Sequence, residues 1–336
     1  MCSHDYEPPA CVLATSPTCS DANPCQLLSG GEVTDATPVP ACETPADSAH
    51  PFYDDGPPAT LTDQDGHTRY ACLFQPATPS PVPLVVFLHG GGGGAENLYG
   101  ATSLRTQATS FDLSGDPDAP GFAVLSIQAR YLHDPVLPET GAIHWDDRTW
   151  NLADNTDAQL VLDWVDALVA AGDVDPDRVY LVGWSEGGFL GQMLGFAHPE
   201  VFASVAVYSA SSPYARSHDD GSTWVEIPEM PSLTTPLYGI VKACDAIGCD
   251  DAQADALDLP RTYVSVEHWQ DQIRALAGVP AFSYLIVNGF GVEASTCSSD
   301  CDVLTAVANH ITWPDGVNGF VDQEPALLQF LRDHPR

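Results

Sequence analysis

One short motif has both the composition and the setting of a nucleophilic serine. Residues 183–188 read Gly-Trp-Ser-Glu-Gly-Gly and match the pattern Gly-x-Ser-x-Gly. The apolar run at residues 178–184 predicts a buried strand before the serine, and residues 189–196 predict a helix after it. A sharp strand-to-helix turn exposes a serine hydroxyl at the end of a sheet, and glycines give the backbone the freedom that this turn needs. We predict that Ser185 is a nucleophile; the alternative is an ordinary serine in a glycine-rich loop.

A second glycine-rich stretch offers donors to the oxyanion that a nucleophilic serine generates. Residues 82–88 predict a buried strand, and residues 89–94 follow it with the sequence His-Gly-Gly-Gly-Gly-Gly. One donor is normally the N–H of the residue after the nucleophile, and the other lies in an early loop after a strand. We therefore predict Glu186 and Gly91 as donors, with Gly92 as the alternative to Gly91. A phosphate-binding loop is excluded because no Lys-Ser or Lys-Thr follows the glycines, and the histidine is expected to be structural.

The base should be a histidine that follows the serine in the chain, with an acid between them. The histidines after Ser185 are His198, His218, His268, His310 and His334. Residues 302–308 predict a late strand, and His310 lies in the turn that follows it. Of the other four, His198 lies beside the nucleophile helix and His218 comes before the acid strand. His268 lies in a helix-like stretch, and His334 lies at the chain end. We predict His310 as the base.

The acid is predicted from its place at the end of a strand. Residues 236–245 run from a proline through an apolar segment to Asp245, between the serine and the histidine. In a parallel sheet, site residues gather at the carboxyl ends of the strands. Asp245 is therefore the predicted acid, and Asp250 and Asp251 are its alternatives.

The remaining pattern alternates between strands and helices. Besides the segments above, strands are predicted at residues 69–74, 121–128 and 202–209, and helices at residues 156–171 and 325–333. Such alternation predicts an α/β fold with a mostly parallel sheet that helices cover on both faces.

The residues that carry these predictions resemble a known family. They are residues 83–90, residues 174–188, residues 236–245 and the turn Asn-His-Ile-Thr-Trp-Pro at residues 309–314. The chain resembles the extracellular esterases that include polyhydroxybutyrate depolymerases, feruloyl esterases and acetylxylan esterases. The resemblance implies an α/β-hydrolase fold, a Ser/Asp/His triad acting on esters, and no cofactor or metal.

The chain departs from this family at several positions. Asn309 replaces the expected glycine before the histidine, and the turn holds one extra residue before Trp313. Glu186 replaces a small or neutral residue after the nucleophile, so we expect its carboxylate to discourage anionic acids in the pocket. The His-Gly-x-x-Asp pattern before the acid is also absent.

Charge and composition exclude two classes of partner. The chain carries 46 acidic residues and 11 basic ones, for a formal net charge of −35, and Lys242 is its only lysine. Such a surface repels nucleic acid and anionic membranes. The apolar runs are too short to span a bilayer.

The cysteines predict an oxidising compartment. An even count of ten, without the tight spacing of a zinc site, favours disulfides, which we predict at Cys244/Cys249 and Cys297/Cys301. Met1 is followed at once by a polar segment, so the sequence is interpreted as a mature form, extracellular or on the cell surface. A cysteine at a mature N-terminus is where bacterial lipoproteins carry lipid, so a lipid anchor at Cys2 is a second hypothesis.

The chain is predicted to divide into two parts. Residues 1–60 are rich in Pro, Thr, Ala, Asp and Cys without periodicity, which indicates a disulfide-stapled N-terminal extension. Residues 61–336 are the predicted catalytic domain. Within it, residues 211–232 are long enough to form a cap, for which Tyr214, Trp224 and Met230 would supply apolar wall.

Together these patterns predict a monomeric serine esterase. We expect Trp184 and Trp313 to contact an ester substrate, either a feruloyl or acetyl ester of the plant wall or a polyester. The competing hypothesis is a surface-displayed binding protein that has the fold without catalysis.

Overall fold

A computed structural model describes most of the chain. The described residues are 39–44, 52–133, 141–147, 149–217, 224–226, 233–256, 264–276, 281–290, 292–294, 301–316 and 321–336. Within this part of the chain, no helix combines the length and the apolar character needed to cross a membrane.

The fold is built on one eight-stranded sheet. Across the sheet the strands are β1 (Ala59–Thr62), β2 (Thr68–Phe74), β4 (Ala123–Ile127), β3 (Val82–Leu88), β7 (Val174–Trp184), β8 (Ser204–Tyr208), β11 (Leu237–Lys242) and β12 (Phe282–Val287). The strands from β4 to β12 are parallel, and β1 and β2 are antiparallel additions at one edge. This confirms the predicted mostly parallel sheet.

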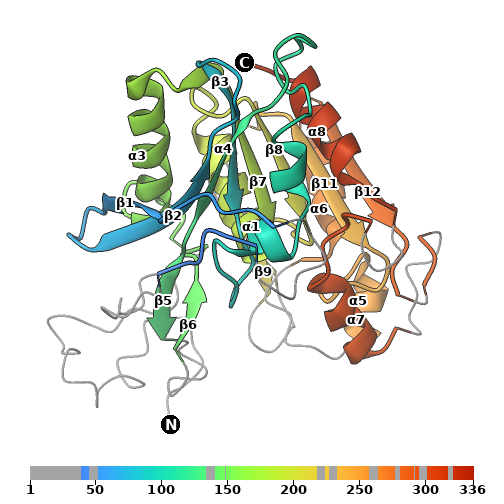
Figure 1. Cartoon of the computed structure of the whole chain (residues 1–336). Helices are drawn as coiled ribbons and strands as arrows, with labels where there is room; N and C mark the ends of the chain where they lie inside the picture. The colour runs from blue at the N-terminus through green and yellow to red at the C-terminus, as the bar shows by residue number, and fades with distance from the viewer. Residues whose placement is uncertain are drawn as a thin grey trace, which may run out of the picture.

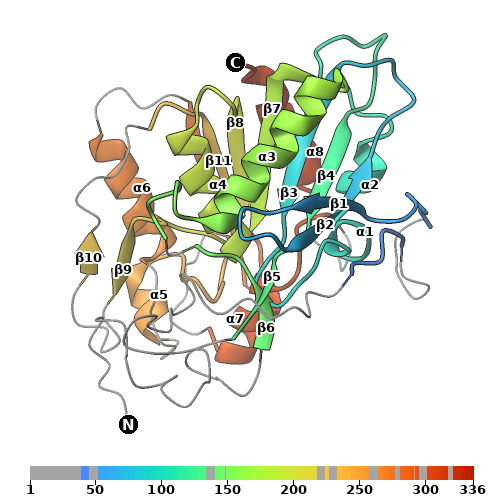
Figure 2. The same cartoon turned by 90° about the vertical axis from the view of Figure 1, so that its left-hand side faces the viewer.

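Helices cover the two faces of the sheet. On one face lie α3 (Thr156–Ala171), α4 (Glu186–Ala197) and α6 (Val266–Ala275); on the other lie α1 (Asn97–Gly100), α2 (Leu104–Gln107) and α8 (Glu324–Asp333). Figure 1 shows α3 and α8 on opposite sides of the sheet, and Figure 2 looks onto the face that carries α3. Two short helices, α5 (Asp251–Ala256) and α7 (Val303–His310), lie beyond the carboxyl ends of the strands.

The hydrophobic core has two halves, one on each face. Strand β3 is buried along its whole length, and alternate residues serve alternate faces: Leu84 and Val86 pack toward α3 and α4, whereas Val85 and Phe87 pack toward α8. Because side chains along a strand alternate with a period of two, a continuous apolar run of this kind is what a strand covered on both faces requires.

Helix α3 has the bounds that the sequence predicts. The side chain of Asn155 accepts the N–H of Ala158, which caps the N-terminus, and Gly172 ends the helix at φ +80°. One face of the helix buries Leu160, Val161, Trp164, Val165 and Leu168 against the sheet. Periodicity and capping therefore agree, as they do in strongly predicted helices.

The segment that carries His310 differs from its prediction. Residues 302–308 were expected to form a strand, but residues 303–310 form helix α7, with His310 as its last residue. The Asp302 side chain accepts the N–H of Thr305, and this cap favours a helix over a strand. The predicted strand is therefore wrong.

The predicted disulfides near the acid are also wrong. Cys244 bonds to Cys301, and their Cα atoms lie 5.6 Å apart. Cys249 is disulfide-bonded as well, so it bonds to neither of these two, and Cys297 lies outside the described residues. Spacing in the sequence is a poor guide here because the start of α7 packs beside the acid turn. A further disulfide joins Cys42 to Cys72 in β2 and ties the described part of the N-terminal segment to the sheet.

Candidate active site

Ser185 lies on a tight turn between β7 and α4. Its backbone has φ 50° and ψ −120°, a conformation that residues other than glycine rarely adopt. Glycines make this turn feasible: a Cβ at Gly183 would meet the carbonyl of Gly187 at 2.4 Å, and one at Gly187 would meet the carbonyl of Leu88 at 2.2 Å. Backbone crowding therefore forces the Gly-x-Ser-x-Gly pattern, and it holds the serine at the carboxyl edge of the sheet.

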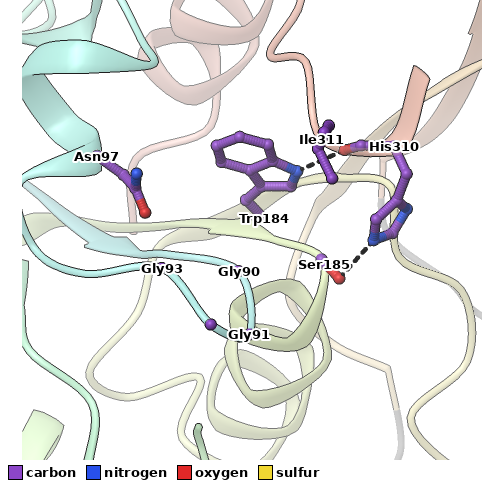
Figure 3. A pocket seen from close by; sticks show the side chains of 9 residues that line it. Gly90, Gly91, Gly93, Asn97, Trp184, Ser185, His310 and Ile311 are labelled. Carbon is purple, nitrogen blue, oxygen red and sulfur yellow. Dashed lines mark hydrogen bonds between the residues drawn. The ribbon is translucent and has the colours of Figure 1, made fainter. Parts of the chain in front are cut away.

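Ser185, His310 and Asp245 form a continuous hydrogen-bonded chain. The Ser185 Oγ lies 2.7 Å from Nε2 of His310, and Nδ1 of the same ring lies 2.8 Å from Oδ1 of Asp245 (Figure 3 shows the serine–histidine contact). Each residue comes from a different element: the elbow after β7, the end of α7 and the turn after β11. The structure thus brings together the three residues predicted as nucleophile, base and acid.

The carboxylate of Asp245 is fully buried and held by two more donors. Oδ2 accepts the hydroxyl of Ser209 at 2.6 Å, and Oδ1 accepts the N–H of Ile247 at 3.0 Å. The alternative acids lie elsewhere: Asp250 accepts the N–H of Gln253, and Asp251 is exposed near His268. Only Asp245 among the three contacts the His310 ring.

The backbone beside Ser185 offers two N–H groups. Within the described part of the chain, neither Gly91 nor Glu186 donates its backbone N–H to a hydrogen bond. The N–H of Gly92 instead donates to the carbonyl of Ile143 at 2.7 Å, which removes the alternative donor. Gly90 and Gly91 line the same pocket as Ser185.

His89 is a structural residue that fixes the glycine loop. Its Nδ1 donates to the carbonyl of Gly90 at 2.8 Å, and its Nε2 accepts the N–H of Ala129 at 3.2 Å. Burial lowers the pKa of His89 to about 4, so the ring is neutral, as this donor and acceptor pattern requires. The ring of Trp145 lies 5.1 Å from that of His89 at a tilt of 42°, and its Nε1–H donates to the carbonyl of His89.

The Ser185 pocket is small and partly apolar. It has a volume of about 240 Å³, and its lining is Gly90, Gly91, Gly92, Gly93, Asn97, Trp184, Ser185, His310 and Ile311. Figure 3 shows the Trp184 indole between Asn97 and His310. This volume lies below the range of about 300–1,000 Å³ that is typical of sites for drug-sized ligands.

Trp313, predicted to contact substrate, and Tyr214, predicted to supply wall in the cap, are both core residues. Trp313 is only 1% exposed and packs against Phe87, Trp184 and Tyr208, with its Nε1 donating to Glu324. The predicted contact of Trp313 with substrate is therefore wrong, whereas Trp184 does line the pocket. Tyr214 is likewise buried, against Phe196 and Trp269. Met230 and the Trp224 side chain lie outside the described part of the predicted cap.

The Glu186 side chain turns away from the pocket. Its carboxylate lies 3.1 Å from Nδ1 of His144 and accepts the N–H of Trp145 at 3.0 Å. His144 ends β6 (Gly141–His144), which pairs with β5 (Arg130–His133). Burial raises the pKa of Glu186, and Glu186 is not among the residues that line the pocket, so its effect on anionic acids stays a prediction.

One cluster of potential metal ligands lies away from the pocket. Asp63, Asp65 and His67 bring their ligand atoms within 4.8 Å of one another. The carboxylate of Asp63 already accepts the N–H groups of Asp65 and His67 and pairs with Arg69 at 3.3 Å. These contacts explain the cluster as a turn between β1 and β2.

Four residues around Ser185, His310 and Asp245 have contacts that the sequence did not predict: Ser209, Tyr208, Lys242 and Asn309. Their roles depend on strand register and on helix α7, which the sequence pattern did not reveal. One signal was present: Trp184, Tyr208 and Lys242 each end an apolar strand with a side chain that can donate a hydrogen bond.

The sheet, the covering helices and the serine elbow together define an α/β-hydrolase. Residues 69–245, just over half of the chain, match the family of esterase PHB depolymerases, and the chain belongs to that family.

Individual relatives cover shorter segments. A poly(3-hydroxybutyrate) depolymerase from Ralstonia pickettii is 25% identical over 181 residues, which are 51% of this chain and 33% of the relative. Feruloyl esterase B from Neurospora crassa is 27% identical over 126 residues, 38% of either protein. The chain therefore spans less than half the length of the curated relatives that it matches. Among solved structures, native pOPH has the same fold, with a TM-score of 0.52, 16% identity, and coverage of 88% of this chain and 90% of that one.

Proposed function

We propose that the chain is a serine hydrolase of carboxylic esters that acts through an acyl-enzyme on Ser185. The observation that carries the proposal is the chain of contacts from the Ser185 Oγ through the His310 ring to Asp245, at 2.7 and 2.8 Å. A nucleophile and a base within hydrogen-bond reach, with the base oriented by a third group, are the requirements of nucleophilic acyl transfer. Membership of an esterase family supports the same reaction.

The proposed mechanism uses each group for one task. Nε2 of His310 takes the Ser185 proton as Oγ attacks the ester carbonyl. The buried carboxylate of Asp245 fixes the other ring nitrogen as a donor and stabilises the imidazolium. The N–H groups of Gly91 and Glu186 donate to the oxyanion. His310 then protonates the leaving alcohol, and water, activated by the same ring, releases the acid.

The surface beside the pocket favours a polyester over a decorated polysaccharide. Four apolar side chains are exposed here, three in α7 and one at the residue that follows it. They are Val303, Leu304, Val307 and Ile311, with exposed fractions of 39%, 83%, 40% and 61%. Their spacing places them on one side of the helix, and Ile311 also lines the pocket. An apolar strip that leads to the nucleophile suits an apolar chain with repeated ester bonds.

The reaction is tested by replacing the nucleophile and comparing substrates. Ser185→Ala should remove ester turnover by at least about 10⁴-fold while the chain stays folded. Ser110→Ala, at an exposed serine outside the pocket, is the matched control. The panel contains nitrophenyl esters of graded length, methyl ferulate, acetylated xylan and a polyester film. Retention of a tenth of the activity by Ser185→Ala would refute Ser185 as the nucleophile. Absence of turnover of every substrate by the parent chain would favour the non-catalytic binding protein.

We also propose that the chain works outside the cytosol, in an oxidising compartment. The disulfides Cys42–Cys72 and Cys244–Cys301 support this location. Residues 1–38 and the lipid anchor hypothesised at Cys2 lie outside the described residues, so the N-terminal extension remains part of this proposal. Intact mass after alkylation without reductant should show no free thiol; ten alkylated cysteines would contradict the proposed location.

A further inference from the structure

Three neighbouring strands end in side chains that point to the same face of the sheet. Trp184 of β7 pairs in register with Tyr208 of β8, and Tyr208 pairs with Ile240 of β11. Lys242 follows Ile240 by two residues and therefore lies on the same face. We call Trp184, Tyr208 and Lys242 the donor row.

The donor row holds the helix end that carries His310. The last four carbonyls of a helix have no partner within it. In α7 each has a donor: Ile311 N–H for Val307, Thr312 Oγ1 for Ala308, Tyr208 OH for Asn309, and Trp184 Nε1 for His310. The carbonyl of Thr312, in the turn that follows, accepts Lys242 Nζ and shares the single hydroxyl hydrogen of Tyr208 with the carbonyl of Asn309.

Lys242 is an unexpected residue at this position. It is the only lysine in a chain of net charge −35, yet it is fully buried and lies beside the triad instead of on the acidic surface. Burying an ammonium group is unfavourable unless charges and hydrogen bonds compensate for the lost hydration. The charged groups that face it are Asp245 and Asp315, and its Nζ lies 5.6 Å from the centre of the Tyr208 ring and 5.8 Å from that of Phe290.

We propose that Lys242 is a positioning residue for the base: its ammonium group holds the Thr312 carbonyl, and through the turn after α7 it keeps the His310 ring in line between Ser185 and Asp245. The proposal rests on the hydrolase function proposed above. A cation at this point also opposes the negative end of the α7 dipole, which an uncharged donor would not do.

The ionisation of Lys242 gives the proposal a pH signature. Burial lowers the pKa of Lys242 to about 8, against the opposing pull of Asp245 and Asp315. The ammonium form, which holds Thr312 most strongly, is therefore present below about pH 8 and lost above it. Turnover should fall on the alkaline side with that midpoint, because the base loses its alignment.

The test compares Lys242→Met and Lys242→Arg with Arg274→Met. Arg274 is exposed on α6 and pairs with Asp271, so its replacement removes one positive charge away from the site. Two measurements are made on each variant. The first gives kcat and KM for a nitrophenyl ester from pH 6 to 10, and the second gives the rate at which a fluorophosphonate labels Ser185. Misplacement of a reacting group by about 1 Å costs roughly 10²-fold. We expect Lys242→Met to lower kcat and the labelling rate about 10- to 100-fold, with KM changed less than about twofold.

Lys242→Arg and a direct titration provide the sharper readouts. Arginine stays charged throughout this range, so Lys242→Arg should keep most of the activity and lose the alkaline fall near pH 8. Labelling with [¹³C,¹⁵N]lysine gives one side-chain signal because the chain has one lysine, and its midpoint should match that fall.

The outcomes separate this proposal from the hydrolase function. Wild-type protein that the fluorophosphonate does not label at Ser185 would overturn both. If the wild type is labelled, and Lys242→Met is labelled as fast as Arg274→Met, the role of Lys242 alone would be overturned. If Lys242→Met does not fold, an alkaline fall that persists in Lys242→Arg, or a lysine midpoint far from that fall, would overturn it too.

Discussion

The side-chain amide of Asn309 donates to the carbonyl of Cys244 at 3.0 Å, so the residue before the base holds the residue before the acid. The same amide group donates to Ala243 at 3.2 Å, and its oxygen accepts the N–H of Phe290 at 2.7 Å. Asn309 is fully buried. This one side chain therefore fixes helix α7 to the acid turn at the end nearest His310.

Asn309→Ala should both destabilise the fold and slow turnover. The change leaves two buried carbonyls and one half-buried N–H without their partner, and each buried group left unpaired costs about 1–3 kcal/mol. We expect a loss of about 2–4 kcal/mol in the free energy of unfolding and a loss of about tenfold in kcat. Urea denaturation and steady-state kinetics measure the two, with Asn151→Ala, whose side chain pairs with Asp154 at the surface, as the control. Equal stability of the two variants would show that the Asn309 contacts contribute little.

The disulfide Cys244–Cys301 ties the acid turn to the other end of α7. It spans 57 residues, and the Cys244→Ser/Cys301→Ser double variant should lose about 2–4 kcal/mol of stability by the loop-closure argument. Activity should fall as well, because both residues adjoin elements of the proposed triad. The pairing is checked by digestion with a protease that cleaves before aspartate, which separates Cys244 from Cys249. A peptide that joins Cys244 to any other cysteine would refute the pairing.

The proposed acid is tested by two matched substitutions. Asp245→Asn keeps the size and removes the charge, so His310 would favour the wrong tautomer, and kcat should fall about 10⁴-fold. Asp250→Asn should cost little, because Asp250 accepts a local N–H and does not contact the His310 ring. The pair is compared in one ester assay under identical conditions. A mild Asp245→Asn with a damaging Asp250→Asn would move the acid role to Asp250.

Glu324 should make stability depend on pH. Burial raises its pKa from 4.5 to about 8, although Ser103 and Trp313 donate to its carboxyl group. The folded chain thus holds the proton more tightly than the unfolded chain, and this contribution is complete below about pH 4.5 and lost as the pH rises to about 8. Glu324→Gln cannot ionise, so its stability relative to wild type should rise over that range by a few kcal/mol. Denaturation midpoints at pH 4.5, 6 and 8 measure this; parallel curves would refute it.

The strongest predictions from sequence were those with a local physical cause. The turn at Ser185 is imposed by backbone crowding at Gly183 and Gly187, so the glycine pattern reports it directly. Helix α3 was predicted with its bounds because periodicity, N-cap and C-cap all agree. Asp245 followed from its place at the end of an apolar strand.

Other predictions failed because they depend on packing between distant segments. The run after Asp302 is short, apolar and rich in β-branched residues, which fits a strand as well as a helix, and its Asp302 cap was the overlooked signal. Whether Trp313 faces a pocket or the core depends on α8, whose Glu324 accepts the indole N–H. Cys244 bonds to Cys301 because α7 begins beside the acid turn, a contact that spacing within the sequence does not encode.

The burial of Lys242 also decides how the molecule can be attached to other materials. Reagents that couple to primary amines find no lysine on this surface, since the only one lies inside beside the proposed triad. Amine-directed dyes or supports would thus react at the α-amino group or, under forcing conditions, at the residue that positions the base. A chain with 46 carboxylates and a pI near 4.1 is better captured on a cationic resin or coupled through activated carboxyl groups.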